Sequence, residues 1–260
     1  MKFPFSNFIF KILPWILPVF LLILWQFTTK TGILPNRILP APSDVYFAAV
    51  ELMKTGELFH HVWISLWRAL AGFLIGGSIG FILGLFNGLF RTTEMLFDTS
   101  IQMLRNIPHL ALIPLVILWF GIGEEAKIFL VALGVLFPIY LNTFHGIKSV
   151  DRGLIEMGKI YGLGDVSLFF HVIFPGALSS ILVGIRFSLG MMWITLIAAE
   201  TISSISGIGY MAMNAREFMQ MDVIILSILL YAFLGKLSDV IARFLERRWL
   251  KWHPGYTKHS

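Results

Sequence analysis

Six apolar stretches dominate this sequence and restrict what it can fold into. A helix that crosses a lipid bilayer needs ~20 predominantly apolar residues, because the backbone polar groups must be satisfied within the helix in hydrocarbon. The stretches are bounded by charged or turn residues and occupy residues 12–28, 66–90, 106–120, 126–144, 177–201 and 223–244. The sequence therefore predicts an all-α membrane protein with six transmembrane helices.

The composition excludes a soluble globular protein. Hydrophobic residues make up 57% of the chain and charged residues 13%, whereas a typical soluble domain has about 25% charged residues. The chain has no Cys, which excludes disulfide scaffolds, thiolate metal sites and cysteine nucleophiles. The net charge of +5 indicates basic cytoplasmic loops in such a protein, so nucleic acid is not expected as a partner.

The distribution of Lys and Arg predicts the orientation. Twelve of these residues, including Arg91 and Arg105, fall on the side of the two termini, and six, including Arg68, fall on the opposite side. The more basic side of a membrane protein usually faces the cytoplasm, so both termini are predicted to be cytoplasmic. No linker divides residues 1–260, which indicates a single membrane domain. Ser43 is expected to cap a short outer helix near residues 44–54 that stops near Gly56.

Glycines recur at every fourth position of the second apolar stretch. They are Gly72, Gly76, Gly80, Gly84 and Gly88. Residues four apart lie on one face of a helix, so these glycines form a bare ridge against which another backbone can pack closely. We expect helix packing to be their role.

Four charged residues lie inside predicted spans, where charges are costly and often functional. Arg186 lies ~14 Å into the fifth span, and Glu200 lies ~21 Å further along, so the two cannot pair directly. Arg186 is expected either to line an anion pathway or to pair with another helix, whereas Glu200 is expected to be solvated or to pin a loop. Lys236 and Asp239 are three residues apart on one helix and are expected to pair.

Motifs of catalysis and cofactor binding are absent from the sequence. The seven His form no HExxH, and neither GxSxG nor GxxxxGK[ST] occurs. We therefore expect no enzyme activity, no metal and no cofactor in this chain. If the protein uses ATP, another chain binds it.

The loop at residues 149–175 has the pattern of two short cytoplasmic helices. Asp151 and Asp165 are expected to cap them, and Gly162 and Gly164 to separate them. An apolar strip on one face of the first helix consists of Leu154, Met157, Gly158 and Tyr161. This strip is expected either to pack under the membrane domain or to dock a soluble partner.

The same loop resembles the signature of the membrane permeases of ABC importers. That signature is EAA, a Gly six residues after the Glu, and a Pro thirteen residues beyond. The segment EMGKIYGLGDVSLFFHVIFP has Glu156, Gly162 and Pro175 at these spacings. Met157 and Gly158 replace the two Ala, and Phe174 stands where Leu is usual, so the docking surface is expected to differ in detail.

Further segments resemble the nitrate, sulfonate and taurine branch of these permeases, and most closely its aliphatic sulfonate permeases. They are RILPAPSDV, SLWRALAGFLIGG, SIQMLRNIPHLALIPLVILWFGIGEEAKIFLVALG, GIRFSLGMMWITLIAAETIS and SGIGYMAMNAREFMQ. The resemblance implies a type I importer permease with its core at residues 62–245 in a bacterial cytoplasmic membrane. It also implies a homodimer, two ATP-binding subunits and an extracytoplasmic substrate-binding protein.

The resemblance further implies roles for individual residues. Glu156 is expected to anchor the docking helix, together with Asp151 and Tyr161, while Gly162 permits the turn and Pro175 fixes the start of the fifth span. The anionic substrate is expected to meet side chains along the pathway: Arg186, Glu200, Ser203, Ser204 and Ser206.

Three alternatives stay open. The same architecture would also import taurine, nitrate or another small oxyanion. An ion-coupled secondary transporter would need intramembrane carboxylates as ion sites, for which only Glu200 and Asp239 are candidates. A membrane enzyme would need a nucleophile and a base close together, and no such pair is recognisable in the sequence.

Overall fold

The computed structural model describes residues 4–252, and in this range the chain is helical with no strand. Four helical stretches are long and apolar enough to cross a bilayer: α3 (Glu57–Leu89), α6 (Glu124–Lys148), the continuous stretch Asp165–Ile202 that contains α9 (Phe174–Ser203), and α11 (Met221–Trp249). The number rises to five if the bent pair of helices at residues 91–105 and 109–120 counts as one further span. The all-helical membrane architecture expected from the sequence is confirmed.

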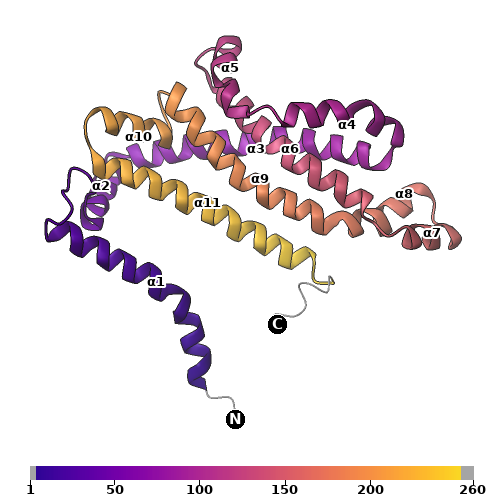
Figure 1. Ribbon diagram of the computed structural model, residues 1–260, viewed down its shortest axis with the longest axis horizontal. Coiled ribbons are helices and arrows are strands. Elements are labelled where there is room, and N and C mark those ends of the chain that lie inside the picture. The colour runs from indigo at the N-terminus through magenta and orange to yellow at the C-terminus, as the bar shows by residue number, and fades with distance from the viewer. Residues whose placement is uncertain (1–3, 253–260) are drawn as a thin grey trace.

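The centre of the bundle is formed by α3, α6 and α9, which pack side by side (Figure 1). In that view α3, α6 and α11 all run toward the right, and α9 runs in the opposite direction. The short helix α10 (Ile208–Glu217) packs against α9 and α11 at the left end. The largest apolar cluster, with Val135 of α6 and Leu196 of α9 at full burial, lies between these helices.

The glycine ridge of α3 faces α6. A Cβ atom on Gly72 would lie 2.6 Å from Cβ of Val131, and one on Gly84 would lie 2.7 Å from the carbonyl oxygen of Tyr140. Added Cβ atoms at Gly76 and Gly80 would overlap the backbone of Ala132 and Leu136. Only glycine therefore allows the two helix backbones to approach this closely.

The third span differs from the prediction. Residues 91–105, expected to lead from one span to the next on the cytoplasmic side, form the helix α4 (Arg91–Arg105). After a break at residues 106–108, η1 (His109–Leu112) and α5 (Ile113–Phe120) continue at an angle of 80° to α4. The polar face of α4 explains why a search for apolar runs missed it: Asp98 accepts a hydrogen bond from Tyr140 Oη at 2.8 Å, and Glu94 pairs with Lys148 at 2.6 Å.

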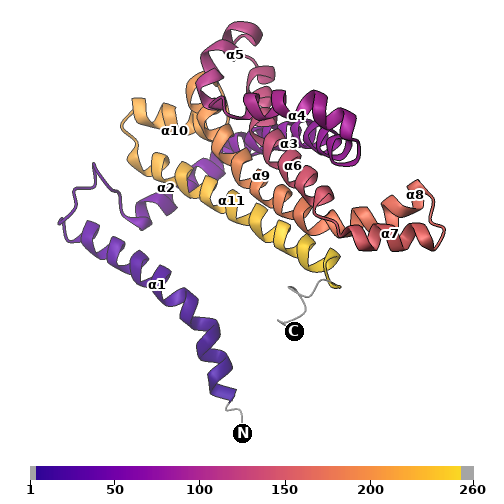
Figure 2. The same cartoon turned by 45° about the vertical axis from the view of Figure 1, so that its right-hand side comes forward.

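The first helix, α1 (Pro4–Lys30), lies apart from the bundle (Figures 1 and 2). It contacts α2 (Pro42–Thr55), and Trp25 Nε1 donates a hydrogen bond to the carbonyl oxygen of Pro40 at 3.0 Å. The N-cap of α2 is Ala41 rather than Ser43, because Pro42 already has the dihedral angle of a first helical residue and Asp44 accepts from the Ala41 N–H. Lys2 and Lys258, two of the twelve basic residues behind the predicted orientation, lie outside the described residues.

Candidate functional site

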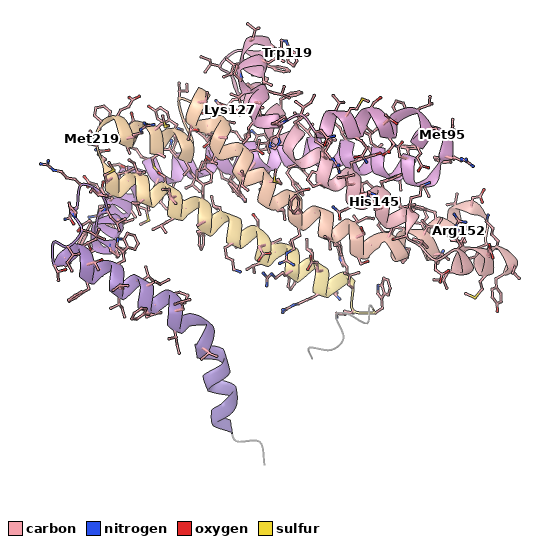
Figure 3. All side chains as sticks on the ribbon, viewed as in Figure 1. Met95, Trp119, Lys127, His145, Arg152 and Met219 are labelled. Atoms are coloured by element: carbon pink, nitrogen blue, oxygen red, sulfur yellow. The ribbon has the colours of Figure 1, made fainter. Side chains whose placement is uncertain are left out.

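The loop at residues 149–175 forms a compact projection at one end of the molecule. Figure 3 shows Arg152, at the start of α7 (Arg152–Ile160), toward the same end as Met95, while Met219 lies at the opposite end. Asp151 is the N-cap of α7 and accepts a hydrogen bond from the Gly153 N–H at 2.7 Å. The cap satisfies one of the free N–H groups at the start of this short helix and gives it a defined first turn.

The far end of α7 presents an exposed apolar surface. Ile160 and Tyr161 are 84% and 80% exposed, and Gly162 has a φ of +81°, a left-handed conformation that favours glycine. Glu156 is exposed and has no hydrogen bond or ion pair within residues 4–252. A groove of about 690 Å³ runs beside the helix, and its lining includes Leu154, Met157, Tyr161 and Pro175. We call this combined surface, formed by α7 and the groove, the docking surface.

Gly158 explains one departure from the EAA signature. A Cβ atom on Gly158 would lie 2.7 Å from Cδ1 of Leu168 and 3.3 Å from Cδ1 of Leu163. The buried glycine thus lets α7 pack closely on the segment that follows it.

The second helix of the loop continues into α9 without interruption. α8 (Asp165–Leu168) is followed by the π-helical segment η2 (Phe169–Ile173) and then by α9. The N-cap of α8 is Gly164, so the prediction that Asp165 caps this helix is wrong; Asp165 is its first residue. Pro175 has no N–H to donate within the helix, and the π-helical turn directly before it accommodates the missing bond.

At the opposite end of the bundle Glu200 is buried and fully bonded. Its carboxylate accepts hydrogen bonds from Ser65 Oγ, Tyr231 Oη and the Gly209 N–H at 2.8–2.9 Å. It also pairs with Arg68 at 2.8 Å, and both side chains have no exposed area. Glu200 therefore joins α3, α9, α11 and the start of α10, and its burial rules out the expected alternative of a solvated carboxylate.

Arg68 is a buried residue that sequence reasoning missed. Its guanidinium forms two hydrogen bonds with Glu124 at 2.5 and 2.6 Å and also donates to the carbonyl oxygen of Ser206 at 2.7 Å. Lys127 approaches Glu124 at 3.1 Å, so two cations and two carboxylates balance in this cluster. We call these residues, with Ser65 and Tyr231, the buried polar cluster; Glu124 lies at its edge and is 51% exposed.

The three serines expected near the pathway have different surroundings. Ser206 Oγ accepts a hydrogen bond from Arg68 at 3.0 Å, so it belongs to the buried polar cluster. Ser204 Oγ is buried without a hydrogen-bond partner within the described part of the chain. The side chain of Ser203 lies outside the described residues.

Arg186 pairs with acidic residues of α11. Its Nε lies 2.8 Å from Asp239 and its Nη1 lies 3.6 Å from Glu246. Asp239 also accepts from Arg243 at 2.8 Å and lies 3.5 Å from Lys236, the pairing expected from the sequence. The arrangement connects α9 to α11 and matches the alternative in which Arg186 has a partner on another helix.

A pocket of about 550 Å³ lies between η1, α6 and α9. Arg105, assigned to a cytoplasmic connection from the sequence, lines it together with His109 and Asn142. Arg105 ends the polar segment 91–105 and is exposed in the single chain, so its residue type and position alone do not predict that it lines a pocket. Residues 4–252 contain no group of three or more His, Cys, Asp or Glu that would hold a metal ion.

Comparisons with known proteins agree on one family. Residues 76–251 match the family model of the binding-protein-dependent transport system inner membrane component. The chain is 62% identical over 256 residues to the aliphatic sulfonates transport permease protein SsuC of Escherichia coli, covering 98% of this chain and 97% of that protein. It is 44% identical to SsuC of Bacillus subtilis, covering 93% and 87%.

A solved structure shows the same fold at lower sequence similarity. The structure, of an amino acid ABC transporter with histidines, superposes with a TM-score of 0.64 at 17% identity. The match covers 77% of this chain and 97% of that one.

Proposed function

The chain belongs to the family of binding-protein-dependent transport system inner membrane components, and from this premise we propose that it is the permease subunit of an ATP-driven importer of aliphatic sulfonates. One observation supports the assignment of the substrate: the identity of 62% to an aliphatic sulfonate permease extends over nearly the full length of both proteins. The chain itself is a translocation subunit, and a separate subunit hydrolyses ATP.

The proposed topology has six spans with both termini in the cytoplasm. It consists of α1, α3, the bent pair α4 and α5, α6, α9 and α11, in a single domain whose core is residues 62–245. The directions of α3, α6, α9 and α11 support it, as does the basic character of the docking-surface end. Charged residues at that end include Arg91, Lys148, Arg152, Lys159, Arg247 and Arg248. The proposed location is the bacterial cytoplasmic membrane.

The docking surface is proposed to receive an ATP-binding subunit. Exposed Ile160 and Tyr161 supply apolar area, and Glu156 is free to pair with a basic group of the partner. A homodimer of this chain would present two such surfaces to two ATP-binding subunits. An extracytoplasmic binding protein would deliver substrate at the opposite end, near α2 and α10.

The continuous helix from Asp165 to Ile202 suggests how closure of the ATP-binding subunits reaches the membrane. A helix moves as a stiff rod, so displacement of α7 and α8 would be transmitted along α9. The π-helical segment before Pro175 is the place where this rod would bend. At its far end α9 carries Glu200, which accepts a hydrogen bond from the Gly209 N–H in the first turn of α10.

For the pathway residues we propose separate roles. Glu200 and Arg68 would hold the outer ends of α3, α6 and α9 together. Ser203 and Ser204 would lie at the outer mouth of the pathway. Arg186 would keep α9 and α11 together during movement, since it already has two carboxylate partners.

An ion-coupled mechanism finds less support. Both candidate carboxylates, Glu200 and Asp239, are already paired with arginine. Neither is a free ion site of the kind that secondary transporters use.

Growth on different sulfur sources tests the proposal. A strain that lacks this gene and has no redundant importer is grown on ethanesulfonate, taurine or sulfate as its sole sulfur source. We expect failure on ethanesulfonate alone and rescue by the wild-type gene. Normal growth on all three would remove the sulfonate assignment, and failure on taurine alone would replace it with taurine.

A further inference from the structure

The pocket between η1, α6 and α9 is an open groove on the side of the bundle, about halfway along α6 and α9, and Val183 and Phe187 in its lining are exposed in the single chain. The residues that α6 and α9 contribute, 134–142 and 183–191, are central in each helix. Arg105 is fourteen residues beyond the start of α4, which corresponds to ~21 Å along that helix. The pocket volume of about 550 Å³ is in the usual range for small-molecule sites.

One side of the pocket carries a cation with no counter-charge. Arg105 makes no ion pair or hydrogen bond through its side chain within the described residues. Arg186, which lines the neighbouring pocket, has Asp239 and Glu246 as partners. Arg105 is exposed in the single chain, and its side chain lines the open side of this cavity. Charged side chains within a membrane-spanning bundle usually face a water-filled cavity or a partner.

His109 stands beside Arg105 as a second polar group. Its Nε2 lies 3.1 Å from Thr195 Oγ1, a contact that fixes the ring at the pocket wall. Neither Asp nor Glu occurs among the described residues that line the pocket. The polar side is therefore suited to an anion and offers nothing to a cation.

The other side of the pocket is apolar. Phe137 and Leu141 of α6 face Val183, Phe187 and Met191 of α9. The three α9 residues are spaced by four, so they form one stripe along the helix. The same stripe lines a second pocket of about 460 Å³ beside Arg186, so the apolar surface continues along α9.

We propose that this pocket holds the substrate during translocation, with the sulfonate group on Arg105 and His109 and the alkyl chain against the α9 stripe. The inference rests on the proposed function and deepens it. It also predicts discrimination, because the ammonium group of taurine would lose its water in the pocket without gaining an acidic partner.

The first test separates uptake rate from substrate affinity. The complete transporter is expressed with Arg105→Gln, Arg105→Lys or Arg91→Gln, and uptake of radiolabelled ethanesulfonate is measured against concentration. Arg91, the first residue of α4, makes the matched control because it is exposed and far from the pocket. We expect Arg105→Gln to lower the maximal rate about tenfold or more, with Arg105→Lys intermediate and Arg91→Gln unchanged. The KM stays constant, since the binding protein collects the substrate.

The results distinguish the two proposals. If wild-type protein imports ethanesulfonate and Arg105→Gln, present in the membrane at the normal level, imports it equally fast, the pocket assignment is wrong and the sulfonate function stands. If the wild type imports none, the proposed function itself fails.

A second test measures the sign of the electrostatic potential in the pocket and does not depend on transport. The chain has no Cys, so Val183→Cys introduces the only thiol of the permease. The rates at which this thiol reacts with an anionic sulfonatoethyl and a cationic aminoethyl methanethiosulfonate are compared in the assembled transporter. We expect Arg105→Gln to lower the anionic-to-cationic rate ratio of this thiol about tenfold. The ratio for a thiol placed by Ser78→Cys, in a separate pocket, stays constant. An unchanged ratio in the Val183→Cys protein would overturn the proposal.

Discussion

Arg68 and Glu200 face each other in the interior at a distance of 2.8 Å, and neither side chain is exposed. A buried charge is tolerated only when partners replace its lost hydration. Each has several partners: Arg68 also bonds Glu124 and Ser206, and Glu200 also bonds Ser65, Tyr231 and Gly209. Removal of Arg68 or Glu200 leaves the other as a buried charge without its charged partner at this contact.

The substitutions Arg68→Gln and Glu200→Gln are therefore each expected to destabilise the protein by about 3 kcal/mol or more. Thermal unfolding of the purified protein in detergent measures this as a clear fall in midpoint temperature. Lys236→Gln provides the control, because Lys236 is 67% exposed and contacts Asp239 only at 3.5 Å. Equal midpoints for all three variants would show that the buried polar cluster contributes nothing to stability.

The two partners in this cluster were not equally predictable from the sequence. Glu200 is the one charged residue near the end of an apolar stretch, which indicates a special role, whereas Arg68 is the third residue of the predicted span 66–90, where a charge is expected to reach the outer surface. In the structure α3 begins at Glu57, eleven residues before Arg68, and draws it into the interior. Arg68 and Glu200 are 132 residues apart in the sequence, so no local sequence pattern indicates that they pair.

Among the elements, α3 and α6 make the closest contact in the bundle. Their approach depends on the four-residue glycine spacing, because an added Cβ at Gly76 overlaps the backbone of Ala132. A backbone cannot move aside as a flexible side chain does, so the helices must separate.

Gly76→Val is thus expected to destabilise the protein by about 1–3 kcal/mol or to reduce its level in the membrane. Gly190→Val in α9 provides the same chemical change where nothing lies within 4 Å of the added Cβ, and it should be tolerated. Measurement of membrane level and unfolding midpoint distinguishes the two. Wild-type behaviour of Gly76→Val would contradict close packing at the ridge.

The turn after α7 offers a similar comparison for coupling. Gly162 has a φ of +81°, whereas Gly164 has a φ of −70°, and neither has an atom within 4 Å of an added Cβ. Valine is strained at the first position and not at the second. We expect Gly162→Val to weaken co-purification of the ATP-binding subunit severalfold, while Gly164→Val retains it. Equal co-purification would show that the shape of this turn is unimportant for docking.

Elements were predictable where their pattern is strong. Apolar length located the long helices, and Asp151 located the start of α7. The helix α4 was not predicted because its contacts with α6 are polar, through Asp98 and Glu94. The continuity of α8 with α9 was not predicted because the pair Pro175–Gly176 normally indicates a break.

At the scale of the whole molecule, three features follow one another along α9. The proposed docking surface lies at one end, the buried polar cluster lies at the other, and α9 passes the pocket with Arg105 between them. We propose that ATP-driven movement at the docking surface is transmitted along α9 to the buried polar cluster. The substrate would then cross beside the α9 stripe.

The most direct test of sulfonate import driven by ATP uses proteoliposomes that contain the permease, its ATP-binding subunits and the binding protein. Uptake of radiolabelled ethanesulfonate is measured with ATP at the nucleotide-binding side, without ATP, and with a proton or sodium gradient alone. We predict uptake only with ATP. Uptake with an ion gradient alone, or none with ATP while the complex hydrolyses it, would contradict the account.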